Sequence, residues 1–179
     1  MPPAIPSTQD EPDTPGPDEP PSIRIELICN TDISGEQIDG WLDQQVQRAV
    51  KLCGFKQAQL NLVIVADDEM AQLHEQYTGV AGTTDVLTFD LAEGGLPLGS
   101  NQPPPSIESD IILCLDEAKR QASHRGHEPR QELLLYAIHG LMHLLGEDDH
   151  DDAAYQRMHA REDALLQQMG FGPLFDPDR

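Results

Sequence analysis

Residues 129–146 restrict the folds open to this chain more than any other segment. Their sequence, PRQELLLYAIHGLMHLLG, is almost entirely apolar after the first turn, and its apolar side chains recur at helical spacing. Proline fits the first turn of a helix and glycine fits its end, so Pro129 and Gly146 mark the two boundaries. A helix that is apolar on nearly all sides is stable only when other elements surround it. We therefore expect this helix to be buried.

Strand and helix patterns alternate in the rest of the chain. Short apolar or alternating segments predict four β-strands, at residues 22–28, 60–65, 86–89 and 110–115. Helical spacing predicts four further helices, at residues 36–53, 67–77, 116–126 and 152–169. Ser34 and Gln37 have the spacing of a capping box for the first of these helices. The pattern favours one α+β domain over residues 22–174, with a small four-stranded mixed sheet packed by about five helices.

Two proline-rich segments are expected to lack regular structure. Residues 1–21 contain eight prolines and five acidic residues but no lysine or arginine, a composition typical of a disordered tail. Residues 92–106 contain three glycines and four prolines, which predicts a flexible loop. The last residues, 175–179, are expected to form a short tail.

The charge of the chain limits its partners. Its 179 residues include 32 acidic and 11 basic side chains, a formal net charge of −21. The resulting field repels the phosphates of a duplex, so we expect no DNA partner, and any RNA has to be bound at a local site. No apolar run reaches ~18 residues, the N-terminus lacks a secretory signal, and the cysteines show no CxxC spacing. These features predict a cytoplasmic protein with no membrane partner.

Two histidines of the apolar helix have the spacing of metal ligands. His139 and His143 are four residues apart, so their rings stand one turn apart on one face, as in helices that bind Zn²⁺. Such pairs also occur by chance, but unpaired imidazoles in an apolar helix are costly. Gly146 lets the chain turn back, and His150 follows as the candidate third ligand. Three protein ligands and one open position are typical of a catalytic zinc.

Gly140 argues against a peptidase. Metalloproteases of the H-E-x-x-H type carry a glutamate beside the first histidine, where it acts as the general base. This chain has Gly140 at that position, so the metal spacing is kept while the peptidase base is absent. Zinc can instead act on a phosphodiester, as a Lewis acid or by lowering the pKa of a bound water molecule.

Three segments together match a known pattern. Residues 139–150, HGLMHLLGEDDH, follow H-G-x-L-H-L-x-G-Y-D-H. Residues 84–89, TDVLTF, are similar to T-D-V-L-S-F, and residues 109–122, SDIILCLDEAKRQA, to G-D-I-x-I-x-x-x-x-A-x-x-Q-A. In this order and spacing, over about residues 58–170, the segments resemble the YbeY family of bacterial zinc-dependent endoribonucleases.

The resemblance to YbeY implies a fold, an activity and partners. It implies an α+β fold with a four-stranded sheet, one Zn²⁺ per chain bound by His139 and His143, and hydrolysis of single-stranded RNA. It further implies a cytoplasmic role in 16S ribosomal RNA 3′-end maturation and ribosome quality control. The implied partners are precursor 16S ribosomal RNA, proteins of the small ribosomal subunit and the Era GTPase.

The chain departs from the family pattern at the third ligand. The family places its third histidine three residues after the glycine, where this chain has Asp149, and His150 follows one residue later. Either the loop has one extra residue and His150 binds the metal, or Asp149 binds it through a carboxylate oxygen. We favour His150, because a neutral imidazole keeps the charge of a three-histidine zinc centre.

A second departure concerns catalysis. The family carries an aromatic residue followed by arginine upstream of T-D-V-L, whereas this chain has Tyr77 and Thr78. Arginine is suited to bidentate contacts with phosphate. Either Arg125 or Arg130 supplies this cation from another element, or nuclease activity is reduced. We include Asp85 as a catalytic candidate that orients a ligand or the loop, although an aspartate at a strand start is often only a turn residue.

Two hypotheses therefore stand side by side. The first is a zinc-dependent endoribonuclease, and the second is a ribosome-assembly factor with a structural zinc and weak or no catalysis. The acidic residues 148–152 are suited either to accept hydrogen bonds from the metal-binding histidines or to stabilise the start of the following helix. His159 on that helix is expected to be core packing.

Overall fold

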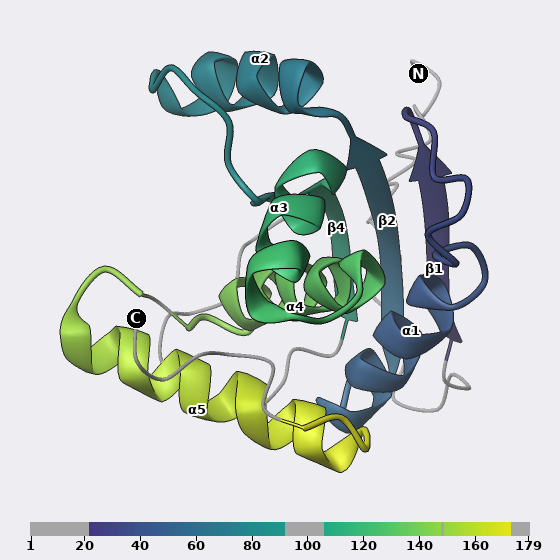
Figure 1. The fold of residues 1–179 in the computed structure, drawn as a ribbon. Helices are drawn as coiled ribbons and strands as arrows, with labels where there is room; N and C mark the ends of the chain where they lie inside the picture. The colour runs from purple at the N-terminus through teal and green to yellow at the C-terminus, as the bar shows by residue number, and fades with distance from the viewer. Residues whose placement is uncertain (1–21, 92–105, 148, 173–179) are drawn as a thin grey trace, which may run out of the picture.

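Four strands form one sheet in the computed structural model, which describes residues 22–91, 106–147 and 149–172 (Figure 1). The sheet consists of β1 (Ser22–Cys29), β2 (Gln57–Val65), β3 (Val86–Asp90) and β4 (Ser106–Cys114). The strands lie in the order β1-β2-β4-β3, with β1, β2 and β4 parallel and β3 antiparallel to β4. The predicted four-stranded mixed sheet is therefore confirmed, and β3 is one of its edges.

Three of the sequence expectations lie largely outside the described residues. These are the tails at residues 1–21 and 175–179 and the loop at residues 92–106. Of the expected loop, only Ser106 is described, and it is the first residue of β4.

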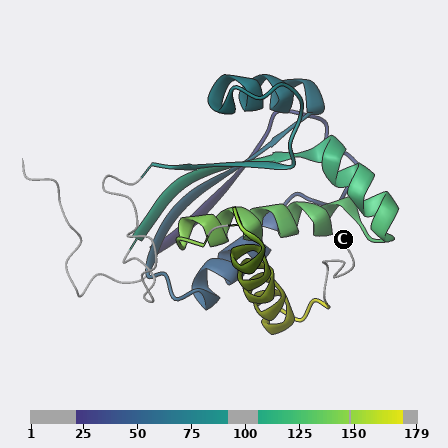
Figure 2. The ribbon, with the colours of Figure 1, turned by 90° about the vertical axis from the view of Figure 1, so that its left-hand side faces the viewer.

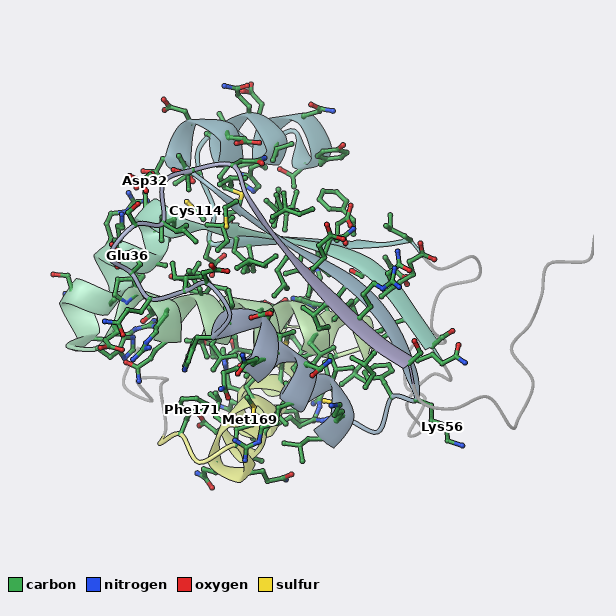
Figure 3. The ribbon with its side chains drawn as sticks, turned by 90° about the vertical axis from the view of Figure 1, so that its right-hand side faces the viewer. Asp32, Glu36, Lys56, Cys114, Met169 and Phe171 are labelled. Carbon is green, nitrogen blue, oxygen red and sulfur yellow. The ribbon has the colours of Figure 1, made fainter. Side chains whose placement is uncertain are left out.

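Five helices are described together with the sheet. They are α1 (Leu42–Leu52), α2 (Asp67–Thr78), α3 (Leu115–Arg125), α4 (Pro129–Leu144) and α5 (Asp152–Gln168). Figure 2 shows α1, α4 and α5 on one side of the sheet and α2 alone on the other. The main core lies between the sheet and the first group of helices. A smaller apolar cluster lies under α2 and includes Met70 and Cys114, which is labelled on that side of the sheet in Figure 3.

Helix α4 is buried, as its sequence predicts. Eleven of its sixteen residues are buried, including the continuous run from Leu133 to Ile138. It contacts β3 and β4 on one side and α1, α3 and α5 on the others. Pro129 is in its first turn, and Glu128 and Gln131 form a capping box there. Of the described helices, α4 included, none is both long and apolar enough to cross a membrane.

The prediction for the first helix was wrong at its start. Helix α1 begins at Leu42 rather than at residue 36, and Ser34 does not cap it. Gln37 and Gly40 both have positive φ angles, 52° and 70°, which interrupt any α-helix at this point. Ile38 is nevertheless buried. Ile38 therefore packs in the core from an irregular segment, and its apolar side chain is not a sign of a helix at this position.

Strand β4 begins four residues before the predicted start at residue 110. Ile107, Ser109 and Ile111 all point into the main core side of the sheet and are buried. The hydroxyl of Ser109 donates a hydrogen bond to the backbone oxygen of Phe89, 2.7 Å away. This partner allows a polar residue to occupy a buried strand position, which the sequence pattern alone does not reveal.

Candidate metal centre

Helix α4 brings two imidazoles together near the edge strand β3. His139 and His143 lie one turn apart, and their Nε2 atoms are 3.1 Å from each other. The ring centroids are 4.7 Å apart with the rings nearly perpendicular. Both side chains are partly buried. The expected pairing of these two histidines on one face is therefore present in the structure.

Asp149 is the third member of the cluster. It follows α4 after Gly146, whose φ of 80° is a left-handed conformation that glycine adopts without strain. An Oδ2 atom of Asp149 lies 3.8 Å from Nε2 of His139. One ligand atom from each of His139, His143 and Asp149 lies within 4.8 Å of the others. Two imidazole nitrogens and one carboxylate oxygen are a donor set that Zn²⁺ accepts, with the fourth position open.

His150 lies beside this cluster but not in it. Its side chain is 85% exposed, and its Nδ1 atom is 4.0 Å from Asp149. The structure therefore brings Asp149, the alternative third ligand, to the histidine pair instead of His150. Two acidic residues of this loop have different contacts. Asp149 lies with the histidine pair, and Asp151 caps α5 by accepting a hydrogen bond from the Ala154 backbone N–H at 2.8 Å.

Glu162 of α5 orients the first histidine from behind. Its side chain is fully buried, and Oε1 accepts a hydrogen bond from Nδ1 of His139 at 2.8 Å. Nδ1 of His143 lies 3.2 Å from the backbone oxygen of Glu147. With both Nδ1 atoms engaged in this way, both Nε2 lone pairs face the cluster. Carboxylate and carbonyl partners of this kind commonly fix metal-binding histidines.

The surroundings shift the pKa values of the two histidines in opposite directions. Burial lowers the pKa of His139, but the hydrogen bond and charge of Glu162, together with the charges of Asp85 and Asp149, raise it above its ordinary value overall. Burial and the neighbouring His139 lower the pKa of His143. A lowered pKa favours the neutral imidazole, which is the form that binds metal.

Sequence reasoning missed Glu162 and described His159 incompletely. His159 is not simple core packing, because its Nδ1 donates to the other oxygen of Glu162 at 2.6 Å. One buried carboxylate thus accepts hydrogen bonds from two imidazoles. A signal was present in the sequence: Glu162 falls on the buried stripe of α5 with Met158 and Leu165, where a carboxylate needs partners.

Replacing Glu162 with glutamine is expected to weaken zinc binding about 10–100-fold, the usual effect of losing such a partner. The amide nitrogen and oxygen cannot both accept from an imidazole, so one of the two histidines loses its partner. Isothermal titration with a competing chelator measures the change. Glu117→Gln, which changes a partly exposed carboxylate of α3 that pairs with Arg120, serves as the control. Unchanged affinity in Glu162→Gln would show that Glu162 does not orient His139.

A cleft of about 790 Å³ opens in front of the cluster. Edge strand β3 contributes Thr88 and Asp90 to its lining, and the preceding loop contributes Asp85. Asp85 is held in place, because Oδ1 accepts hydrogen bonds from the Val86 backbone N–H at 2.8 Å and from the Thr84 hydroxyl at 3.1 Å. Among the described residues that line the cleft, none is lysine or arginine.

Comparison with known proteins identifies the family. The family model described as Endoribonuclease YbeY matches residues 25–170. The chain belongs to the YbeY family. Endoribonuclease YbeY of Bacillus pumilus is 33% identical over 155 residues, which cover 83% of this chain and 96% of that protein. Endoribonuclease YbeY of Acidothermus cellulolyticus is 39% identical over 113 residues, covering 61% of this chain and 69% of that protein.

A solved structure supports the fold. A Thermotoga maritima protein determined in solution matches with a TM-score of 0.52 and 22% identity, covering 87% of this chain and 99% of that chain. This likeness agrees with the α+β architecture described above. The predicted YbeY resemblance is thus confirmed by sequence, and the fold by structure.

The two arginines suggested as replacements for the YbeY arginine lie elsewhere. Arg125 is bound to the fully buried Glu132, with Nη1 3.0 Å from each carboxylate oxygen. Arg130 pairs with Glu128 and lies over the ring of Trp41, 5.0 Å from its centroid. Neither arginine lines the cleft, because each is engaged at the start of α4 or just before it.

Thr78 does line the cleft, at the position where YbeY proteins are expected to carry arginine. Its hydroxyl donates a hydrogen bond to the backbone oxygen of His74 at 2.6 Å. The side chain is therefore used to close the last turn of α2. It brings no positive charge to the cleft, and the other described lining residues include no lysine or arginine.

Gly140 lies where α4 packs closely against β3 and β4. A Cβ atom at this position would be 2.6 Å from Oγ1 of Thr88 and 3.2 Å from Cγ2 of Ile111. Gly140→Ala is therefore expected to lower the free energy of unfolding by about 1–3 kcal/mol, the usual effect of overpacking. Thermal denaturation followed by circular dichroism measures it. Combining it with Thr88→Ala should restore part of the loss, and full stability of Gly140→Ala alone would contradict the tight contact.

Proposed function

We propose that this chain is a zinc-dependent endoribonuclease that hydrolyses phosphodiester bonds in single-stranded RNA. The cluster of His139, His143 and Asp149 in the cleft carries the proposal, since its donor set fits one Zn²⁺ with an open position. Membership of the YbeY family supports RNA as the substrate. A bound zinc ion would lower the pKa of a coordinated water molecule and stabilise negative charge on a phosphate oxygen.

The residues of the chain have separate parts in this proposal. Glu162 and the backbone oxygen of Glu147 orient the two histidines. We assign to Asp85 the orientation of water or substrate, because its carboxylate is fixed at the cleft beside the cluster. Arg125 and Arg130, named with Asp85 as catalytic candidates from the sequence, have no such part, since other side chains hold them outside the cleft.

We extend the proposal to the cellular role that the family resemblance implies. This role is 16S ribosomal RNA 3′-end maturation and ribosome quality control in the cytoplasm, with small-subunit proteins and the Era GTPase as partners. A chain of net charge −21 is repelled by free RNA. Docking through basic ribosomal proteins would overcome this repulsion. Tight binding to naked RNA at physiological salt would contradict that route.

One observation favours the second candidate, a ribosome-assembly factor with a structural metal. The described part of the cleft contains three aspartates and no lysine or arginine, so no side-chain cation is available there to stabilise charge on a phosphate. In this case the metal would hold the loop after α4 in place. RNA binding would then occur without turnover.

Metal removal separates the two candidates. Zinc-loaded protein is expected to cleave a labelled single-stranded RNA from the 16S 3′ region, and chelation is expected to abolish cleavage while leaving the circular dichroism spectrum unchanged. Adding zinc back should restore the activity. A folded protein with one zinc per chain that cleaves neither this RNA nor RNA within pre-ribosomes would support the assembly factor and contradict the nuclease.

A further inference from the structure

Tyr77 is an exposed aromatic side chain at the end of α2. Its side chain follows Met70 and Leu73 on one face of the helix, at a spacing of three and four residues. Met70 and Leu73 pack against the sheet in the smaller apolar cluster, but Tyr77 is 57% exposed. The next residue, Thr78, lines the cleft. The apolar face of α2 thus ends in an exposed aromatic ring, one residue before a side chain that lines the cleft.

Phe89 of β3 holds the ring of Tyr77 from one side. The two ring centroids are 4.7 Å apart with an interplanar angle of 63°, an edge-to-face arrangement. The neighbours of Phe89 on the strand, Thr88 and Asp90, line the cleft. Side chains alternate along a strand, so Thr88 and Asp90 face the α4 side of the sheet, and Tyr77 lies across the edge strand β3 from them. A ring fixed on one side and exposed on the other is suited to stack on a flat ligand.

The described lining of the cleft is acidic, so a stacking contact that needs no charge would matter more for RNA binding there. Its described lining includes Asp85, Asp90 and Asp149 but neither lysine nor arginine. Proteins that bind nucleic acid mainly through phosphates use those basic side chains. Affinity for RNA must here come from groups other than side-chain cations. Stacking of a base on an aromatic ring supplies affinity without charge and tolerates any base.

We propose that Tyr77 stacks on one unpaired base of an RNA strand that runs from the cleft over the edge strand β3. The proposal rests on the proposed function, because it takes RNA as the ligand. Bases in a duplex are stacked on each other and have no free face for a protein ring. A stacking contact at Tyr77 therefore also selects single-stranded over double-stranded RNA.

The alternative is that Tyr77 only covers Phe89. Three variants of the full, zinc-loaded chain distinguish the two. Tyr77→Phe keeps an aromatic ring, Tyr77→Leu keeps apolar cover over Phe89 without a ring, and Leu52→Ala removes an exposed apolar side chain from α1 as a control. Stopped-flow anisotropy with a fluorescent, unpaired RNA of ten nucleotides measures binding before cleavage. Thermal denaturation verifies that each variant is folded.

Tyr77→Leu is expected to weaken RNA binding about tenfold or more, while Tyr77→Phe and Leu52→Ala remain within about threefold of the parent. RNAs in which one base at a time is removed identify the stacked base. Its removal should weaken binding to the parent as much as Tyr77→Leu does, and should have no further effect in Tyr77→Leu, because both changes delete the same contact.

Two results would overturn the proposal in different ways. If the parent binds RNA and Tyr77→Leu binds it equally well, the stacking contact is refuted while the proposed function stands. The same holds if every base removal weakens binding to the parent and to Tyr77→Leu equally. If the folded, zinc-loaded parent binds no RNA either free or in pre-ribosomes, the proposed function fails, and the stacking proposal fails with it.

Discussion

Replacing His143 with alanine is expected to lower zinc affinity by more than about 100-fold and to abolish RNA cleavage. Loss of a partner behind a ligand already weakens metal sites 10–100-fold, so loss of a ligand itself should have a larger effect. Nε2 of His143 lies 3.1 Å from that of His139, in position to bind the same ion. Zinc per chain, measured by atomic emission after dialysis, should fall from one to nearly none.

Two further substitutions settle the third ligand in the same measurement. Asp149 lies with the histidine pair, whereas the side chain of His150 is exposed. Asp149→Ala should therefore lose zinc nearly as His143→Ala does, and His150→Ala should keep it. His124→Ala, on the exposed surface of α3, is the matched histidine control. Zinc retained by Asp149→Ala and lost by His150→Ala would restore the ligand set favoured from the sequence.

Replacing Glu132 with alanine is expected to lower the free energy of unfolding by about 3–5 kcal/mol. Its buried carboxylate binds Arg125 and also His127, and removing it leaves the arginine charge partly buried without its partner. Each kcal/mol corresponds to about 2–4 °C in a domain of this size, so the melting temperature should fall by roughly 6–20 °C. Scanning calorimetry of the zinc-loaded protein measures this shift.

Arg130→Ala serves as the comparison for the stability of Glu132→Ala. Arg130 pairs with an exposed Glu128 and lies over the ring of Trp41, and each of these contacts contributes about 1 kcal/mol or less, so Arg130→Ala should cost less than about 2 kcal/mol. Below their melting temperatures, both variants should cleave RNA at the rate of the parent. A Glu132→Ala protein as stable as the parent would show that this ion pair is not a structural support. Loss of cleavage in stable Arg130→Ala would return that residue to the list of catalytic candidates.

The central helix and its histidine pair could be predicted from local sequence. Burial of α4 follows from apolar residues on nearly every side, and the position of His139 relative to His143 follows from helical geometry. The family motifs, which are short segments with fixed internal spacing, identified the family, and the zinc ion and the RNA substrate that they imply stay predictions. Helix α1 was predicted too long, since Ile38 contacts the core without being helical.

The partners of the site could not be predicted in this way. Glu162 lies 23 residues from His139 along the chain, and only the packing of α5 on α4 joins them. The sequence alone does not show whether Arg125 contacts a phosphate or another side chain. In the structure it pairs with Glu132, which is fully buried and therefore needs a cation. Packing thus pairs this arginine with Glu132, and its absence from the described lining of the cleft could not be read from the sequence.

The sequence by itself determined that a buried helix presents two imidazoles on one face, because helix periodicity is a local property. It also determined the family. The tertiary structure decided which residue joins the two histidines in the candidate metal cluster, which carboxylate orients His139, and that neither Arg125 nor Arg130 lines the described part of the cleft. These outcomes depend on distances between elements far apart in the chain, which are set by packing and by the need of buried charges for partners.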